Sequence, residues 1–188
     1  MRVVLCGAKA SGKSTIGNAL ARRLGTNFID LDDVILTLAK MRSIDAPSCA
    51  EIYRRHGEAL FRRLEQEAIL EIRNEERCIL STGGSTLLDP ISRHRLREKA
   101  VWVFLDASSA YLWDRVSVKR LPAYLESSAS PAAAFAARVS RIRETVTPLC
   151  DHLIPVEDRT PAEIVTDIVN QLSRENTARS NAIVIPRE

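Results

Sequence analysis

An eight-residue segment near the N-terminus, GAKASGKS at positions 7–14, has the composition and spacing of a phosphate-binding loop. It fits the pattern G-x-x-x-x-G-K-[ST] and lies between a short β-branched run at 2–6 and a helical pattern that begins at Ser14. Glycines allow backbone geometries that point consecutive N–H groups at phosphate oxygens, and the following helix offers its positive end. Lys13 adds a charge for the β- and γ-phosphates, and the Ser14 hydroxyl is placed to hold Mg²⁺. We therefore expect a nucleoside triphosphate to bind through Gly7, Ala10, Ser11, Gly12, Lys13, Ser14 and Thr15.

A second group of polar side chains, Asp30, Asp32 and Asp33, lies at the end of an expected strand at 27–30. In open α/β sheets, ligands bind beyond the carboxyl ends of the strands, so these carboxylates should lie near the phosphate loop. Asp30 and Asp32 share one face if the extended conformation continues. Asp32 or Asp33 could instead cap the next helix. Because Lys13 is expected nearby, we favour a functional role for Asp30 and Asp32.

The elements that must position these groups alternate between strands and helices. The pattern predicts strands at 2–6, 27–30, 78–81, 101–105 and 152–156. It predicts helices at 14–24, from 32, at 58–73, from 90, from 108, around 135–146 and at 160–173. Strand–helix–strand units of this kind build a parallel sheet. The segment from Arg120 to Pro131, rich in serine and proline, predicts a mobile surface loop with little apolar burial.

Length and composition indicate one globular domain. The 188 residues, 45% hydrophobic and 27% charged, fit a single core at 1–173 with a polar tail at 174–188. A net charge of +3 is too small to predict a nucleic-acid partner, and no apolar stretch is long enough to predict a membrane span. The four cysteines form no C-x-x-C pair, which predicts neither a zinc nor a redox site and fits the cytoplasm. No N-K-x-D element for guanine recognition is present, so we expect ATP.

Four motifs follow one another along the chain: the loop at 7–15 with Ile16-Gly17, the Asp-x-Asp at 30–32, G-E-x-x-F-R-x-x-E at 57–65, and Thr-Gly-Gly at 82–84. The same motifs occur in this order in the shikimate kinases, which the chain resembles over about residues 2–173. The resemblance implies an α/β P-loop kinase fold with three α/β/α layers, a central five-stranded parallel sheet and a lid at about 116–131. It also implies ATP and Mg²⁺ as cofactors, and a monomer that transfers the γ-phosphoryl group to the 3-hydroxyl of shikimate, an acid alcohol.

The resemblance also implies roles for individual residues. Lys13, Asp32 and Arg120 would be catalytic, with Asp32 orienting or deprotonating the attacking hydroxyl. Arg62 would bind the substrate carboxylate, with Glu65 fixing its orientation. Magnesium would be held by Ser14 and, through water, by Asp30. The other implied contacts are with the substrate, through Gly83, Gly84, Ser85 and either Arg141 or Arg143, and with the adenine, through Arg115, Arg159 and Pro161.

Departures from the family pattern concern the acceptor and not ATP. Ser85 replaces the third glycine of Gly-Gly-Gly, the lid has Arg120-Leu121-Pro122 in place of Arg-Pro-Leu, and neither Arg141 nor Arg143 has the usual spacing from the aspartate at 151. The alternatives are another small P-loop kinase, for a polyol acid such as gluconate or for a nucleotide, and a non-catalytic ATP-binding protein. For single motifs, residues 62 and 65 could form only a surface ion pair, and residues 83–84 only a turn.

Overall fold

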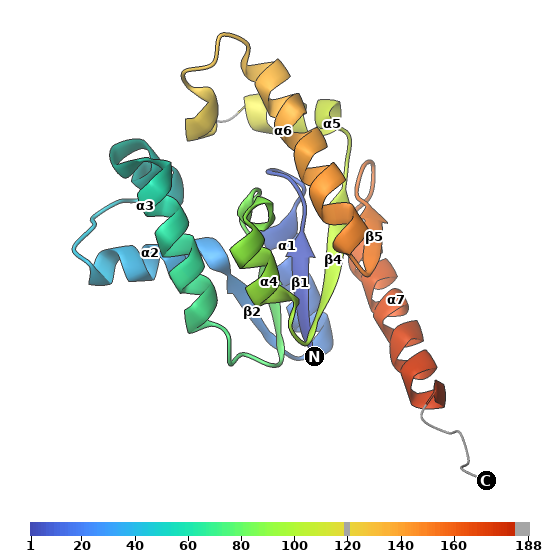
Figure 1. Ribbon diagram of the computed structural model, residues 1–188. Coiled ribbons are helices and arrows are strands. Elements are labelled where there is room, and N and C mark those ends of the chain that lie inside the picture. The colour runs from blue at the N-terminus through green and yellow to red at the C-terminus, as the bar shows by residue number, and fades with distance from the viewer. Residues whose placement is uncertain (119–120, 183–188) are drawn as a thin grey trace.

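Five parallel strands form the centre of the protein, which a computed structural model describes over residues 1–118 and 121–182 (Figure 1). Their order across the sheet is β2 (Asn27–Asp30), β3 (Cys78–Ser81), β1 (Arg2–Cys6), β4 (Ala100–Asp106) and β5 (His152–Pro155). Val4 of β1 pairs with Leu80 on one side and with Trp102 on the other. The predicted α/β class and five-stranded parallel sheet are confirmed.

Helices cover both faces of this sheet (Figure 1). On one face α1 (Lys13–Leu24) packs against α7 (Pro161–Ala182), while α4 (Pro90–Arg97) and α6 (Pro131–Val146) lie on the other. α3 (Cys49–Glu71) packs beside α4 and against α2 (Leu31–Met41), and α5 (Ser109–Ser117) packs against α6. Every residue of β1 and β3 is buried, as expected for strands covered on both faces. Within the described ranges no helix is long and apolar enough to cross a membrane.

Close packing of α1 against β2 fixes the position of the phosphate loop. A Cβ atom at Gly17 would overlap the ring of Phe28, so only glycine allows this approach. Ile16 and Leu20 are buried on the same helix. The N-terminus of α1 is therefore held at the carboxyl end of β1, where open α/β sheets bind their ligands.

Two predicted helices differ in extent from those in the structure. The third helix, expected at 58–73, begins at Cys49 with Ser48 as its N-cap and is interrupted at Gly57, where φ is 80°. The last helix, expected to end at Ser173, continues to Ala182. It continues because the polar sequence after 173 contains no glycine or proline before Pro186. The predicted boundary between domain and tail thus falls inside α7, and residues 183–188 lie outside the described part.

The segment after α5 is packed against the domain. It contains a short 3₁₀ helix, η2 (Ala123–Leu125), which contacts α3 and α6. Leu125 is 1% exposed and Pro122 is buried. The prediction of little apolar burial here is wrong for Pro122 and Leu125, which are buried where η2 contacts α3 and α6.

Candidate active site

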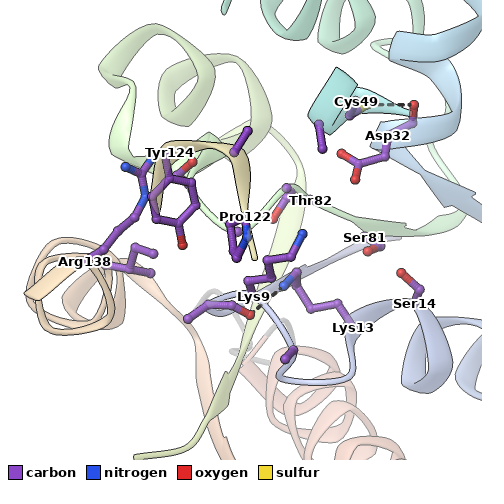
Figure 2. A pocket seen from close by; sticks show the side chains of 18 of the residues that line it. Lys9, Lys13, Ser14, Asp32, Cys49, Ser81, Thr82, Pro122, Tyr124 and Arg138 are labelled. Carbon is purple, nitrogen blue, oxygen red and sulfur yellow. Dashed lines mark hydrogen bonds between the residues drawn. The ribbon is translucent and has the colours of Figure 1, made fainter. Parts of the chain in front are cut away.

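A cavity of about 450 Å³ opens at the carboxyl ends of β1 and β3, between the phosphate loop, α3 and α6 (Figure 2). Residues predicted separately for the nucleotide, the metal and the substrate line this single space. They are Ala10, Gly12, Lys13, Ser14, Thr15, Asp30, Asp32, Arg62, Gly83, Gly84, Ser85 and Arg115. The cavity can therefore hold a phosphate donor and an acceptor side by side.

The backbone of the phosphate loop has the conformation that its glycines predict. Gly7, Ala10 and Gly12 have φ values of 138°, 69° and 94°. Glycine is required at position 7 because a Cβ atom there would also lie 2.7 Å from the carbonyl oxygen of Leu105. Ser11 is 2% exposed, and its hydroxyl has no hydrogen-bond partner within the described residues. An orphaned buried hydroxyl in such a loop fits a site that phosphate oxygens complete.

Lys13 lies under the loop at the start of α1. Its ammonium group donates hydrogen bonds of 2.9 Å to the carbonyl oxygens of Gly7 and Ala8, and the residue is 8% exposed. Burial lowers the pKa of Lys13 to about 8, although the nearby carboxylates of Asp32 and Asp30 raise it. The lysine is thus a desolvated cation whose charged form a bound phosphate would stabilise.

Asp30 joins the phosphate loop to α2. Its Oδ2 accepts a hydrogen bond of 2.5 Å from the Ser14 hydroxyl, and its Oδ1 accepts one of 3.1 Å from the backbone N–H of Asp32. Asp30 is therefore the N-cap of α2, and the alternative that Asp32 or Asp33 provides the cap is wrong. A hydroxyl beside a carboxylate is a donor set that Mg²⁺ accepts.

Because Asp30 provides the cap, the carboxylate of Asp32 is free to face the cavity (Figure 2). The residue is exposed, and it lines the cavity together with Lys13. Burial raises the pKa of Asp32, the charge of Asp30 raises it further, and Lys13 lowers it. Cys49, on α3, contacts the backbone carbonyl oxygen of Asp32 through its thiol at 3.4 Å. A carboxylate with a raised pKa is suited to accept a proton from a bound alcohol.

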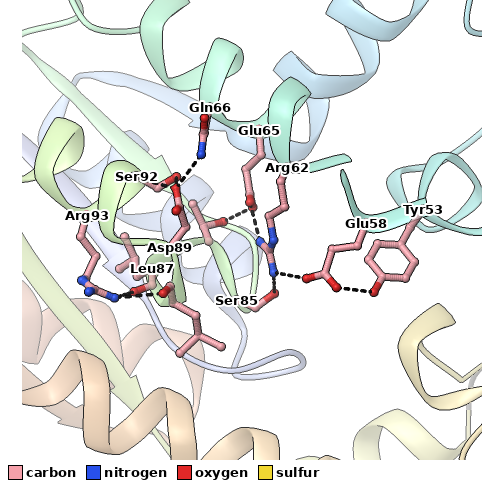
Figure 3. A network of polar contacts seen from close by, with 12 residues as sticks. Tyr53, Glu58, Arg62, Glu65, Gln66, Ser85, Leu87, Asp89, Ser92 and Arg93 are labelled. Atoms are coloured by element: carbon pink, nitrogen blue, oxygen red, sulfur yellow. Dashed lines mark hydrogen bonds and ion pairs between the residues drawn. The ribbon is translucent and has the colours of Figure 1, made fainter. Parts of the chain in front are cut away.

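Arg62 and Glu65 form a partly buried ion pair beside Asp32, in which the Glu65 side chain is enclosed and the Arg62 side chain is 20% exposed, so the alternative of a surface pair is wrong (Figure 3). Glu65 is 1% exposed. Its two oxygens accept hydrogen bonds of 2.6 Å from Arg62 and 2.6 Å from the Thr86 hydroxyl. A Cβ atom at Gly83 would lie 2.7 Å from the Thr86 hydroxyl oxygen, and one at Gly84 would lie 3.0 Å from the backbone nitrogen of Lys9. Both glycines are therefore needed for the close packing around the cavity. They do more than form a turn.

The lid segment and α6 close the cavity on the side opposite α3. Pro122 and Tyr124 line it, and the guanidinium of Arg138 lies 4.1 Å from the centre of the Tyr124 ring. Glu126 pairs with Arg54 of α3 at 2.9 Å, which fastens the lid segment to the helix that carries Arg62. On the lid side Arg115 also lines the cavity, where it donates a 2.9 Å hydrogen bond to the Tyr111 hydroxyl.

Other predicted residues lie outside this cavity. Arg141 is exposed on α6, and Arg143 pairs with Asp106 at 2.9 Å. In the loop before α7, Arg159 pairs with Asp167 at 3.2 Å, and Pro161, the first residue of α7, is exposed. Arg120 lies outside the described residues.

Arg138, which lines the cavity, was not predicted. Its helical spacing is the signal that identifies it. It follows Phe135 by three residues and precedes Ile142 by four, so it shares the apolar face of α6. The spacing from Asp151, which led to the prediction of Arg141 or Arg143, selects arginines on the exposed side of α6 instead.

The parallel sheet, the loop before α1 and the cavity with three carboxylates and three arginines define a P-loop kinase, an ATP-dependent phosphotransferase. A sequence profile described as "Shikimate kinase" matches residues 9–173. A shikimate kinase of Geobacter sulfurreducens is 36% identical over 166 residues, which cover 88% of this chain and 87% of the relative. The chain belongs to the shikimate kinase family.

Two further comparisons agree with this assignment. A shikimate kinase of Geobacter metallireducens is 42% identical over 106 residues, and the aligned part covers 56% of each chain. The crystal structure of shikimate kinase from Aquifex aeolicus is 26% identical with a TM-score of 0.74, and the match covers 94% of this chain and 98% of that one.

Proposed function

We propose that this protein transfers the γ-phosphoryl group of ATP to the 3-hydroxyl of shikimate. The observation that carries the proposal is that Lys13, Asp32 and Arg62 line the same cavity. A phosphate-binding cation, a carboxylate with a raised pKa and a carboxylate-binding arginine are the groups that such a transfer needs. Membership of the shikimate kinase family supports shikimate over gluconate or a nucleotide as the acceptor.

The nucleotide side of the cavity would act mainly by positioning and by charge. The loop amides and Lys13 would hold the phosphates in line with the acceptor, because phosphoryl transfer depends mostly on alignment and on neutralising the equatorial oxygens. Ser14 and Asp30 would hold Mg²⁺, which supplies further positive charge to the phosphate oxygens when bound. Arg115 would stack on the adenine from one side, with Arg159 and Pro161 in the loop that would hold its other side, and Arg120 of the lid would reach the phosphate and the substrate.

The acceptor side would orient the alcohol through its acid group. Asp32 would accept the hydrogen bond, and then the proton, of the attacking hydroxyl, while Gly83 and Gly84 leave room for the ring. Arg62 alone offers little net attraction for an anion because Glu65 neutralises it. Arg138 has no carboxylate partner among the described residues, so we assign it, in place of Arg141 or Arg143, as the second cation for the substrate carboxylate.

Release of ADP with and without an acceptor tests this function. We expect rapid ADP formation with ATP, Mg²⁺ and shikimate, little with gluconate or a nucleoside monophosphate, and a single phosphate ester at the 3-hydroxyl by ³¹P NMR. ADP formation with gluconate but not with shikimate would assign the cavity to another acid alcohol. Tight ATP binding without turnover on any of these acceptors would support a non-catalytic nucleotide-binding protein.

We also infer, from the resemblance, that the protein acts as a monomer in the cytoplasm. Sedimentation at micromolar concentration should give the mass of a single chain of 20.9 kDa. A mass of twice this value would contradict the monomer.

A further inference from the structure

Ser85 places a hydroxyl group at the acid-binding end of the cavity. It follows Gly84 and precedes η1 (Thr86–Leu88), and it belongs to the cavity lining. Its Oγ lies 3.4 Å from Nη2 of Arg62, and both side chains point toward the same space (Figure 3). The hydroxyl is therefore within reach of any group that Arg62 binds.

The two ends of the Arg62 guanidinium are not equally occupied. Nη1 donates a short hydrogen bond of 2.6 Å to Glu65, whose side chain is 2% exposed. Among the described residues, Nη2 makes two long contacts of 3.4 Å, one to Glu58 and one to Ser85. The Glu58 side chain is 57% exposed, so solvent weakens that contact. Nη2 is thus the end of Arg62 that can bind an incoming anion.

The charges around Arg62 show why a bound anion needs a second hydrogen-bond donor there. One guanidinium faces the two carboxylates of Glu58 and Glu65, so the group has a net charge of about −1 before any ligand arrives. An anion at Nη2 meets this negative charge and gains from each additional hydrogen-bond donor. A serine hydroxyl can accept from Nη2 and donate its own proton at the same time.

We propose that Ser85 is a specificity-determining residue of this chain, which accepts a hydrogen bond from Nη2 of Arg62 and donates one to the carboxylate of the acceptor. The proposal rests on the proposed function for the identity of that acid. In this arrangement Ser85 and Arg62 contact the two oxygens of one carboxylate. The contact is remote from the attacking hydroxyl, so it contributes equally to binding in the ground state and the transition state.

Three variants and two ligands test this role. The variants are Ser85→Ala, Ser85→Thr, which keeps the hydroxyl, and Ser140→Ala, a control on the exposed face of α6. Shikimate and its uncharged methyl ester are titrated into each variant by calorimetry, and steady-state kinetics are measured with shikimate and ATP varied. Thermal unfolding is recorded for all proteins.

We expect Ser85→Ala to raise the Kd and KM for shikimate about tenfold, the loss typical of one hydrogen bond to a charged group, with kcat and the KM for ATP unchanged. Ser85→Thr should restore most of the affinity, and Ser140→Ala should match the wild type. For the methyl ester, all the proteins should have similar Kd values.

An unchanged Kd for shikimate in Ser85→Ala would overturn the proposal, and so would an equal loss for the acid and the ester. A parallel fall in kcat and in the unfolding temperature would assign Ser85 a structural role instead. A wild type that binds shikimate without turnover would contradict the proposed function, while the titrations would still decide the role of Ser85. A wild type that does not bind shikimate would overturn both.

Discussion

Gly83→Ala tests whether close packing behind the cavity holds the substrate-binding groups in place. The added Cβ would lie 2.7 Å from the Thr86 hydroxyl oxygen and 3.3 Å from Oε1 of Glu65. Thr86 is fully buried and donates a 2.6 Å hydrogen bond to that same oxygen. The new methyl group therefore has to displace the hydroxyl from the carboxylate that orients Arg62.

The cost follows from these two contacts. Overpacking a core by one methyl group costs about 1–3 kcal/mol. Weakening a hydrogen bond to a buried carboxylate adds about 1–2 kcal/mol, and the lower backbone entropy of alanine in the unfolded chain offsets roughly 0.5 kcal/mol. We expect a net loss of about 2–4 kcal/mol, which lowers the unfolding temperature by about 5–15 °C for a domain of this size. The KM for shikimate should rise because Arg62 loses its fixed orientation.

Urea and thermal unfolding of a double-mutant cycle isolate the cause. Thr86→Ala removes the hydroxyl that the new methyl group would meet, so Gly83→Ala should cost at least about 1 kcal/mol less in that background. Gly84→Ala, whose Cβ would approach the backbone of Lys9 instead, should gain nothing from Thr86→Ala. Free-energy changes of Gly83→Ala and Thr86→Ala that add to within about 0.5 kcal/mol would refute the steric reasoning.

Three further predictions concern the donor, the acceptor and the lid. Lys13→Met should reduce kcat more than Asp32→Asn. Neutralising the phosphate charge contributes most of the rate acceleration in phosphoryl transfer, whereas a general base accelerates the reaction roughly 10²–10⁴-fold. A larger loss of kcat in Asp32→Asn would contradict this. Since burial lowers the pKa of Lys13 to about 8, the cation is lost as pH rises through that value, so kcat/KM for ATP should fall above about pH 8. A profile that stays flat to about pH 9.5 would exclude Lys13 as the titrating group. Glu126→Gln removes the partly exposed pair with Arg54 and should raise the KM for shikimate by no more than about fivefold, with faster hydrogen exchange at 121–126. Exchange rates unchanged from the wild type would show that the pair does not fasten the lid.

Local sequence patterns predict the donor half of the site well. The phosphate loop is recognisable because its glycines, its lysine and the helix that follows are consecutive in the chain. The carboxylates at 30 and 32 were also predicted, and the family resemblance assigns them different roles, but the sequence does not show that Asp30 caps α2. Asp30 caps α2 through Oδ1 and accepts a hydrogen bond from the Ser14 hydroxyl through Oδ2, and Gly17 allows the close packing of α1 against β2 that brings Ser14 and Asp30 together.

The acceptor half depends on packing between distant segments, which local patterns do not encode. Arg138 reaches the cavity because the apolar face of α6 docks there, and its spacing from the aspartate at 151 carries no such information. Leu125 looks like part of a polar loop until α3 and α6 are placed on either side of it. The burial of Glu65 is likewise visible only once Gly83 and Thr86 are seen to pack against it.

The central claim is that a phosphate donor at Lys13 and an acid alcohol at Arg62 share one cavity but are bound by different residues. Steady-state kinetics of Arg62→Ala, with ATP and shikimate varied independently, test this claim most directly. Arg141→Ala, at an exposed position of α6, provides an arginine control. We predict a rise of about a hundredfold in the KM for shikimate with the KM for ATP unchanged, and wild-type values for the control. A raised KM for ATP with an unchanged KM for shikimate would contradict the account.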